Sequence, residues 1–597
     1  MDIFELIQHK AAEEIENNFS EVIDPYEIQV QHTKKEFKGD FTIVTFPLAK
    51  ILKTKPDEIA RVLGEAMKEN VEVLENFEVA GGFLNLSLHD SYWIELVNQF
   101  YPEGSIPPEK DHRKEKVLVE YSSPNTNKPL HLGHIRNNLL GWSVSEILKK
   151  RGHEVIKACL FNDRGASICR TMVAWKNFAN GETPDDAGKK GDHFAGDYYV
   201  RFAEELDNQV KELVVKGMDK EKATEDAPLM KQNRETLLKW EEGDEETLRV
   251  WRMINNWVYQ GFEETYKRLG VDFDRYYYES ETYLLGRDIV REGLQKGVFY
   301  EESDGSVWVD LQEEGLDKKL LLRSDGTSVY MTQDIGTAQL KYDEYQPEKS
   351  IYVVGNEQDY HFQVLKVILE KLGKNYAGGI FHLSYGMVDL PTGKMKSREG
   401  TVVDADDLLE EMKVNAARIT RSLGKIDEMT SEEQDELFEM IGQGALKFFI
   451  LRSDARKRIT FSPEESIDFQ GFTGPFIQYT HARICSLLRK AGFDDSDNRK
   501  LSFSSASSLE ASERELVKFL LNYSSTLEAA EKNYNPAEIA HYAYHLAKLF
   551  NKFYHEHPVK DEPDESKRNF RMALSFLVKG TIKESMALLG IKVPEKM

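Results

Sequence analysis

The chain has 597 residues, which at about 150 residues per domain corresponds to roughly four structural units. Hydrophobic residues make up 40% of it and aromatic residues 11%, so the chain can bury large cores, and wholesale disorder is excluded. Its 78 lysines and arginines against 103 aspartates and glutamates give a net charge of −25, which excludes a generically basic nucleic-acid binder but leaves room for a local basic groove.

Cys159, Cys169 and Cys485 are too few for a disulfide scaffold, and no CxxC pair is present that would bind zinc. The chain begins without the basic start and apolar run of a secretory signal. No stretch approaches the roughly 18 apolar residues that cross a bilayer. We therefore expect a soluble protein of a reducing compartment, the cytoplasm, with no membrane partner and no protein-bound metal.

The first 112 residues are typical of a small α+β unit. Apolar residues recur at helical spacing from Phe4 to Ile15, and short apolar runs at 41–44 and 83–86 predict strands. A stretch rich in proline and charge around 101–116 predicts a linker to the next domain.

In the next segment the spacing of the apolar residues changes, and the new pattern predicts a βαβ unit. Strands are expected at 117–121 and 155–160, with a helix at about 133–150 between them. A strand, a crossover helix and a second strand imply parallel pairing and a doubly wound α/β sheet. Further strand-to-helix alternations at 328–340 and 351–372 extend this sheet domain, which we place at 113–405.

A polar, strongly charged stretch at about 180–255 interrupts the sheet domain, and we interpret it as a solvated helical insertion. From about 405 onward amphipathic helices replace the strands, and one is expected at 537–555. We interpret 406–460 as a helical connector and 461–597 as an all-α bundle.

The most informative stretch follows the first parallel strand and enters a helix. Ligands collect at this place in doubly wound sheets, and a helix start offers free backbone N–H groups to phosphate. His131 and His134 are three residues apart on one helical face, so both can donate to a phosphoryl oxygen. Taken alone, the pair could equally be surface or cap histidines, or a metal pair lacking a third ligand. The motif residues are Pro124, Asn125, Thr126, Asn127, Lys128, Pro129, Leu130, His131, Leu132, Gly133 and His134.

A second motif lies at 390–400, where glycines bracket a loop that carries Lys394, Lys396 and Arg398. Three cations placed around a triphosphate would stabilise the charge that develops in a transition state. Taken alone, the loop could also be a solvated turn.

In this order, the two motifs resemble the two signature motifs of the class I aminoacyl-tRNA synthetases. Further segments are similar to the arginyl-tRNA synthetase family in particular, and the resemblance covers essentially the whole chain. These segments are 120–136, 162–165, 358–361, 474–483 and 549–554.

The resemblance implies that His131 and His134 contact the ATP phosphates, with Gly133 under the adenine, and that the second motif closes over the pyrophosphate. Ser397 stands where the class-wide motif has a lysine, a departure common among arginine enzymes, and Lys128 is expected to substitute for it. The implied catalytic residues are Lys128, His131, His134, Lys394, Lys396 and Arg398. The implied ATP-binding residues are His131, Gly133, His134, Lys394, Met395, Lys396 and Ser397.

The resemblance also implies an arginine pocket. Tyr330 and Asp334 would contact the guanidinium of the substrate. Glu120 and Asn125 would hold its amino-acid end, and Gln358 would be the fifth residue of the pocket. A guanidinium presents a planar fork of donors that suits carboxylates, whereas a lysine ammonium cannot satisfy a bidentate partner. For single residues other interpretations remain: Tyr330 could be core packing and Asp334 a helix cap.

By the same resemblance, the unit at 1–112 would contact the tRNA, 113–405 would be the Rossmann-like catalytic domain and 461–597 the anticodon-binding bundle. Basic residues and aromatics interleave in the helical half, a pattern that suits phosphates and unstacked bases, although helical spacing alone predicts that most of the aromatics are core. These residues are Arg452, Arg456, Lys457, Arg458, Arg483, Arg489, Lys490, Lys567, Arg568 and Arg571, with Tyr479, Tyr542, Tyr544, Phe553 and Tyr554.

The function implied is that of an arginine–tRNA ligase, which activates L-arginine with ATP and Mg²⁺ to arginyl-adenylate and transfers it to the 3′ end of tRNA(Arg). We expect a monomer that needs tRNA before it activates arginine. The alternatives are a class I synthetase for another amino acid, a catalytically silent tRNA-binding paralogue, and a small-molecule adenylyltransferase. The acidic pocket argues against the first, the intact motifs against the second, and the helical carboxyl-terminal half against the third.

Overall fold

The computed structural model describes residues 3–34, 36–108, 110, 113–391, 403–422, 429–493, 501–503 and 508–597. The chain divides into two compact units, each built from segments that are far apart in the sequence. The first consists of Met1–Ser105, Leu488–Leu521 and Leu549–Val578, and the second of Ile106–Leu487, Asn522–Lys548 and Lys579–Met597.

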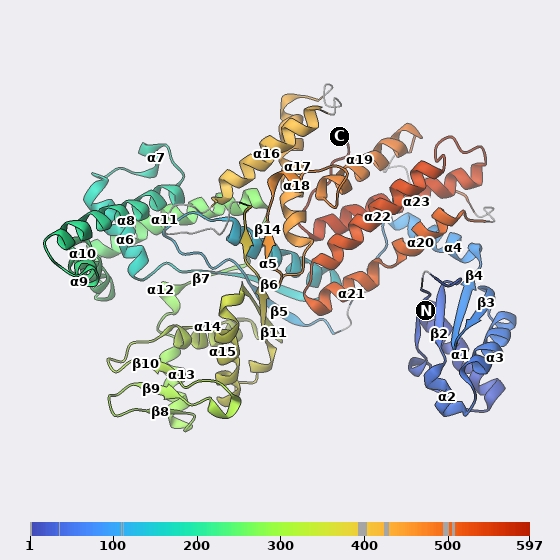
Figure 1. Ribbon diagram of the computed structural model, residues 1–597, viewed down its shortest axis with the longest axis horizontal. Helices are drawn as coiled ribbons and strands as arrows, with labels where there is room; N and C mark the ends of the chain where they lie inside the picture. The colour runs from blue at the N-terminus through green and yellow to red at the C-terminus, as the bar shows by residue number, and fades with distance from the viewer. Residues whose placement is uncertain are drawn as a thin grey trace. The chain divides into compact units, whose positions relative to one another are not determined.

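The first unit contains an antiparallel sheet in the order β1-β2-β4-β3 with helices beside it (Figure 1). The strands expected at 41–44 and 83–86 are confirmed, and most residues of β2 and β4 are buried in the core of this unit. The elements are α1 (Ile3–Phe19), β1 (Val30–His32), β2 (Phe41–Val44), α2 (Phe46–Leu52), α3 (Pro56–Asn70), β3 (Leu74–Ala80), β4 (Phe83–Leu88) and α4 (Asp90–Phe100).

Helices from the far end of the chain belong to this same unit. Arg514 of α20 (Ala511–Leu521) pairs with Asp90 at the start of α4, and Lys518 pairs with Asp40 beside β2. The sequence, interpreted as a chain of separate domains, did not indicate this association.

The second unit contains the predicted parallel sheet, in the order β12-β11-β5-β6-β7. The chain runs outward from β5 to β7 and then returns to β11, so the strand order reverses between β5 and β11. Ligands of doubly wound sheets bind at the carboxyl ends of the strands at such a switch point. The strands are β5 (Lys116–Glu120), β6 (Glu154–Phe161), β7 (Arg275–Tyr278), β11 (Lys349–Gly355) and β12 (Ile380–Tyr385), and the helices beside them are α5 (Leu132–Arg151), α14 (Tyr330–Tyr345) and α15 (Asp359–Lys371).

Close packing fixes α5 against the end of β5. A Cβ added at Gly141 would lie 2.3 Å from Tyr121, so only glycine allows the helix to approach the residue that follows the strand. Val119 and Ile351, in the facing centres of β5 and β11, are fully buried. The loop between β5 and α5 is therefore held at both ends.

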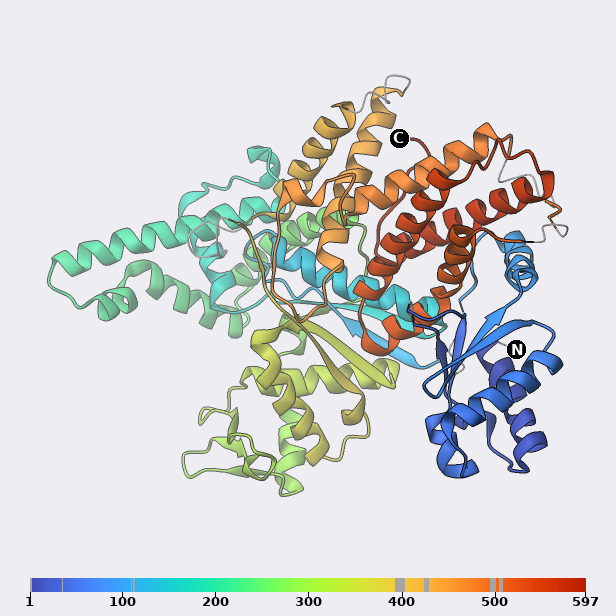
Figure 2. The same ribbon diagram turned by 45° about the vertical axis from the view of Figure 1, so that its right-hand side comes forward.

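The charged stretch is helical, as predicted, and in both ribbon views it projects away from the parallel sheet (Figure 1, Figure 2). It also has an apolar core of its own, which includes Phe194, Phe202 and Leu229. Its helices are α7 (Pro184–Ala187), α8 (Gly191–Val215), α9 (Lys220–Asp226), α10 (Pro228–Glu241) and α11 (Glu245–Leu269). The preceding helix α6 (Ala166–Phe178) lies before the predicted stretch and contributes Val173 to the same core.

One predicted alternation was wrong. The strand before α14 is β10, which pairs antiparallel with β9 in a small separate sheet, and it is not part of the parallel sheet. Short runs of three or four residues carry too little periodicity to reveal their partner. The elements of this module are α12 (Glu279–Thr282), α13 (Gly286–Gln295), β8 (Phe299–Glu301), β9 (Val307–Val309) and β10 (Lys319–Leu322).

Beyond residue 403 the described chain is almost entirely helical, as expected. The exception is β14 (Ile459–Thr460), which pairs in parallel with β13 (Val388–Asp389). The remaining helices are α16 (Ala405–Ser422), α17 (Ser431–Leu451), α18 (Pro463–Ser466), α19 (Gly474–Lys490), α21 (Tyr523–Asn533), α22 (Ala537–Glu556) and α23 (Glu565–Leu588). Among the described residues no helix is both long and apolar enough to span a membrane.

Candidate active site

The first motif lies at the switch point of the parallel sheet. Its loop leaves β5, continues the parallel pairing through a bridge between Asn125 and Asn162, and enters α5. Thr126 is fully buried and its hydroxyl donates to Asn255 of α11. The loop is thus anchored to the end of β6 and to the helical insertion, which makes its backbone a rigid support.

The two histidines of the motif form the amino-terminal cap of α5. The Nδ1 atom of His131 accepts a hydrogen bond from the backbone N–H of Gly133 at 3.1 Å, and Nδ1 of His134 accepts from the N–H of His131 at 3.1 Å. A neutral imidazole that accepts at Nδ1 carries its proton on Nε2. Both rings therefore have an Nε2–H that can donate to a phosphate, and the ring centroids are 3.9 Å apart.

Electrostatics keep these rings neutral. Burial, with a smaller contribution from the Lys128 ammonium, lowers the pKa of His131 to about 4. Burial also lowers the pKa of His134 well below its usual value, and His131 and Lys128 lower it further. At neutral pH the site thus offers neutral donors beside Lys128, whose own pKa is lowered by burial.

The position of the His131 ring requires a glycine at residue 133. A Cβ at this position would lie 2.9 Å from Cε1 of His131, so a larger residue would displace that ring. This contact gives the glycine a role in addition to the predicted approach to the adenine, which no contact in the structure tests.

Residues 392–400 of the second motif lie outside the described residues, so the positions of Lys394, Met395, Lys396, Ser397 and Arg398 stay predictions. The chain on both sides of it contacts the first motif or the helix α5 that the motif begins. After it, the N–H of Leu132 donates to the carbonyl of Val403 at 3.2 Å, and the N–H of Ala405 to that of Leu130 at 2.9 Å. Before it, Arg136 of α5, two residues beyond the first motif, donates to the carbonyl of Met387 at 3.2 Å. The following flank is therefore held against the first motif, and the preceding flank against the helix that the first motif begins.

Two polar residues of α5 that follow the motif were missed by the sequence analysis. Arg136 is fully buried and also donates to the carbonyls of Ala455 and Lys457 at 2.9 and 2.7 Å. Asn137 accepts from the N–H of Ser122 at 2.6 Å and donates to the carbonyl of Val353 in β11 at 2.7 Å. Their signal was their place in the sequence, because both follow the motif within three residues.

Among the predicted arginine-binding residues, Glu120 is already paired. It is 6% exposed, and its carboxylate forms an ion pair with Lys341, which is itself buried. The Lys341 ammonium also lies 4.6 Å from the ring centroid of Tyr352, the residue opposite Glu120 in β11. A ligand at Glu120 would therefore contact a carboxylate whose charge is partly neutralised.

Tyr330 and Asp334 occupy one face at the start of α14. Tyr330 is 77% exposed, which excludes the core-packing interpretation. Asp334 lies inside the helix, and Val329 is the capping position, so the helix-cap interpretation is wrong as well. The Asp334 carboxylate is 2.5 Å from Nε2 of His361 in α15.

A further carboxylate near this pocket was missed. Burial raises the pKa of Glu279 to about 7, Arg164 opposes the rise, and the negative charges of Asp163 and Asp334 add to it. Asp163 is 1% exposed and accepts hydrogen bonds from Ser280 and Tyr259. Glu279 starts the short helix α12 after β7, so only the folded chain brings it within the electrostatic influence of Asp334.

The remaining predicted residues lie at the ends of β5 and β11. Asn125 and Gln358 are exposed, and Gln358 ends a short 3₁₀ turn after β11 (Asn356–Gln358). Asn127 is 3% exposed, and its Oδ1 has no hydrogen-bond partner among the described residues.

A cavity of about 210 Å³ opens beside the first motif. It connects the motif with α8 of the insertion and with the segment that follows the second motif. Its lining includes Lys128, His131, His193, Tyr199 and Asp404.

Several of the basic and aromatic residues considered for RNA contact point into the protein. Arg571 is 2% exposed and pairs with Glu513 and Glu562, each at 2.6 Å. Tyr542 and Phe553 are buried, as the helical spacing predicted for most of the aromatics. These residues are corrected to structural roles.

Comparison with known proteins identifies families for three segments. The model described as "tRNA synthetases class I (R), catalytic domain" matches residues 103–462, "DALR anticodon binding domain" matches 477–597, and "Arginyl tRNA synthetase N terminal domain" matches 5–88.

Curated relatives include the arginine–tRNA ligases of Parabacteroides distasonis and Bacteroides thetaiotaomicron, each 52% identical, with 96% of each chain covered. Among solved structures, the arginyl-tRNA synthetase of Thermus thermophilus matches with a TM-score of 0.80 at 25% identity, covering 100% of both chains.

Proposed function

From the premise that this chain belongs to the arginyl-tRNA synthetase family of class I, we propose that it performs the family's two-step ligation of L-arginine to tRNA(Arg) with the residues described above. The chain is an arginine–tRNA ligase, and its catalytic domain binds ATP. The observation that supports the residue roles best is the histidine cap, which leaves both Nε2–H groups of the motif available at the switch point.

In the first step the carboxylate of arginine attacks the α-phosphorus of ATP, and pyrophosphate leaves. In the second step the terminal ribose 2′-hydroxyl of the tRNA attacks the arginyl carbonyl, and AMP leaves. The protein positions the reactants and stabilises phosphoryl charge, so no covalent enzyme intermediate is formed. His131 and His134 donate to the phosphates, and the rigid cap means that neither ring reorganises during the reaction.

The cations of the second motif, Lys394, Lys396 and Arg398, stabilise the leaving pyrophosphate, and Lys128 supplies the charge that Ser397 lacks. Removing one such donor typically costs about 3 kcal/mol of transition-state stabilisation. Support for Lys128 comes from its place on the lining of the cavity beside His131. Mg²⁺ enters with the nucleotide as part of the substrate, held mainly by phosphate oxygens.

The arginine side chain lies between Tyr330 and Asp334, with Glu279 as an additional carboxylate. The exposed tyrosine and the adjacent carboxylates support this placement, because a guanidinium fork needs several acceptors. Glu120, Asn125 and Gln358 hold the amino-acid end, and Lys341 restrains Glu120.

The partner is tRNA(Arg), bound through the bundle at the carboxyl-terminal end and the amino-terminal α+β domain. We further propose that the protein works as a cytoplasmic monomer. A chain of this length with only three cysteines suits a reducing compartment.

The decisive experiment is arginylation of total tRNA with labelled arginine and ATP, run beside labelled lysine. Attachment of arginine alone supports the ligase and its pocket. Attachment of neither, with tRNA still bound, would instead identify a silent RNA-binding paralogue. A His134→Ala variant is the control, because it should bind tRNA and fail in ATP–pyrophosphate exchange.

A second assay concerns the order of binding. We expect ATP–pyrophosphate exchange to require tRNA, and exchange at full rate without tRNA would contradict this.

A further inference from the structure

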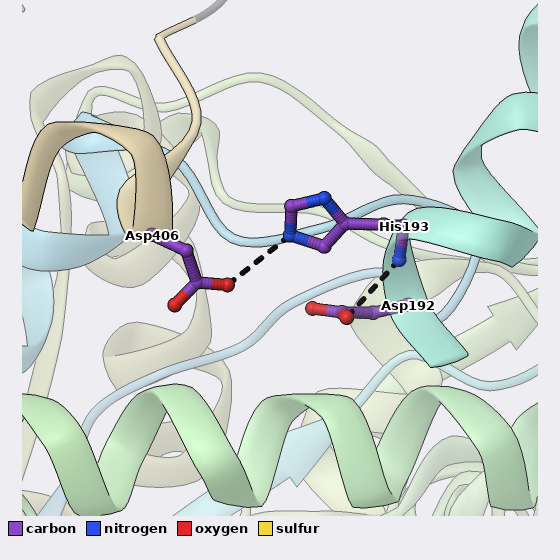
Figure 3. A group of neighbouring side chains, drawn as sticks. All are labelled: Asp192, His193 and Asp406. Carbon is purple, nitrogen blue, oxygen red and sulfur yellow. Dashed lines mark hydrogen bonds and ion pairs between the residues drawn. The ribbon is translucent and has the colours of Figure 1, made fainter. Parts of the chain in front are cut away.

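A polar cluster joins the helical insertion to the segment that follows the second motif. Lys190 and His193 stand at the start of α8, and Asp404 and Asp406 stand at the start of α16. Figure 3 shows the ring of His193 directed at the Asp406 carboxylate, with Asp192 beside it.

The cluster is held by short contacts. Nε2 of His193 is 3.1 Å from Oδ2 of Asp406 and 3.5 Å from Oδ2 of Asp404. The Lys190 ammonium donates to Oδ2 of Asp406 at 2.6 Å and to Asp192 at 3.2 Å. Thr265 of α11 donates to Asp406 at 3.1 Å. The insertion therefore holds this one carboxylate with three donors.

Charge explains the strength of the cluster. Asp192, His193 and Asp406 bring possible metal ligands within 4.8 Å of one another. The Lys190 ammonium forms ion pairs with both carboxylates. The lysine thus supplies the positive charge that a metal ion would supply at such a site. Burial opposes ionisation of Asp406, but hydrogen bonds from His193 and Lys190 outweigh it and lower its pKa to about 2.

Asp404 connects the cluster to the catalytic backbone. Its carboxylate accepts the N–H groups of Asp406 and Asp407 at 2.8 and 3.2 Å, which caps α16. Its backbone pairs in antiparallel fashion with His131. A displacement of Asp404 would therefore be transmitted to the residue that caps α5.

We propose that Lys190 and His193 are positioning residues for adenylate formation, an inference that rests on the proposed function. Their contacts fix the carboxylates of Asp406 and Asp404. The backbone of Asp404 in turn pairs with His131 and sets the direction of its ring. The helical insertion thus has a catalytic role without touching the substrate. Because a misplacement of about 1 Å can cost on the order of 100-fold in rate, small shifts of this backbone suffice.

The test is ATP–pyrophosphate exchange in the presence of tRNA for His193→Ala, His193→Gln and Asp406→Asn. We expect His193→Ala and Asp406→Asn each to lower kcat roughly 10- to 100-fold, with the KM for arginine changed less than about twofold, because the arginine pocket is formed by other elements. His193→Gln keeps a side-chain N–H donor and should restore most of kcat. A double variant that combines His193→Ala with Asp406→Asn should be no slower than the slower of these two single variants, because both substitutions break the contact between His193 and Asp406.

Lys189→Ala is the matched control. Lys189 precedes Lys190, but its ammonium pairs with Asp197 of α8 at 2.6 Å, and its loss should leave kcat unchanged. Thermal unfolding of each variant checks that the fold is intact, and His193 is exposed enough to be replaced without a large loss of packing.

The proposal is overturned if His193→Ala keeps wild-type kcat, if it raises the KM for arginine as much as it lowers kcat, or if His193→Gln fails like alanine. A wild-type protein that attaches no arginine would refute the proposed function instead, so the two failures are distinguishable.

Discussion

Glu279 has a pKa of about 7 because it is buried, and because Asp163 and Asp334 oppose its charge while Arg164 favours it. A bound guanidinium would favour the ionised form and lower this pKa, so arginine binding should release a proton below about pH 7. Binding should therefore strengthen as pH rises to about 7, by at most about tenfold per pH unit, and then level off.

Isothermal titration of arginine across roughly pH 6 to 8 measures this dependence. A Glu279→Gln variant should bind more weakly and without the slope. A wild-type affinity that does not change with pH in this range would show that Glu279 does not face the guanidinium.

Asp334 should carry much of the side-chain specificity. Asp334→Asn removes a charge-assisted contact worth about 1.5–3 kcal/mol, so kcat/KM for arginine should fall on the order of 10- to 100-fold. Steady-state aminoacylation measures the change. Asp343→Asn is the control on the same helix, since Asp343 is exposed and accepts a hydrogen bond from Gln339 of its own helix. Equal effects of the two substitutions would contradict the assignment.

At the scale of elements, the approach of α5 to β5 depends on one glycine. Gly141→Ala places a Cβ 2.3 Å from Tyr121, and such overpacking should cost about 1–3 kcal/mol of unfolding free energy. It should also lower activity, because α5 carries the histidine cap. Denaturant unfolding measures the loss.

Gly378→Ala is the control for this prediction, because no atom of the described residues lies within 4 Å of a Cβ at Gly378. If Gly141→Ala is as stable as Gly378→Ala, then α5 can shift, and the close approach does not fix the motif.

The predicted elements differ in how much local signal they carry. The strand at 117–121 was predictable because a buried parallel strand gives a continuous apolar run. The helix after it was predictable because it connects two such strands and ends at Gly152. The strand predicted at the start of 328–340 is absent, and β10 and β14 were missed. A strand of two to four residues is defined by its partner, which lies elsewhere in the chain.

At the scale of the whole molecule, a buried ion pair joins distant segments of the first unit. Arg571 of α23 and Glu513 of α20 are 2% and 0% exposed. Glu513→Ala leaves a buried arginine with one carboxylate partner fewer and should cost about 3–5 kcal/mol of unfolding free energy.

Thermal and denaturant unfolding of the full chain measure this loss. Glu515→Ala removes the exposed pair with Lys552 from the same helix and should cost no more than about 1 kcal/mol. Similar losses in the two variants would mean that the buried pair adds no more than a surface one.

The amino-acid sequence alone determined the family, the parallel-sheet architecture and the residues of both motifs, because motif chemistry and apolar periodicity are local properties of the chain. The roles assigned to single residues remain predictions. Only the tertiary structure decided that the charge of Asp334 acts on Glu279, that Arg136 binds carbonyls on both sides of the second motif, and that His193 holds Asp406. These contacts depend on backbone pairing and burial between segments far apart in the sequence, and no local pattern records them.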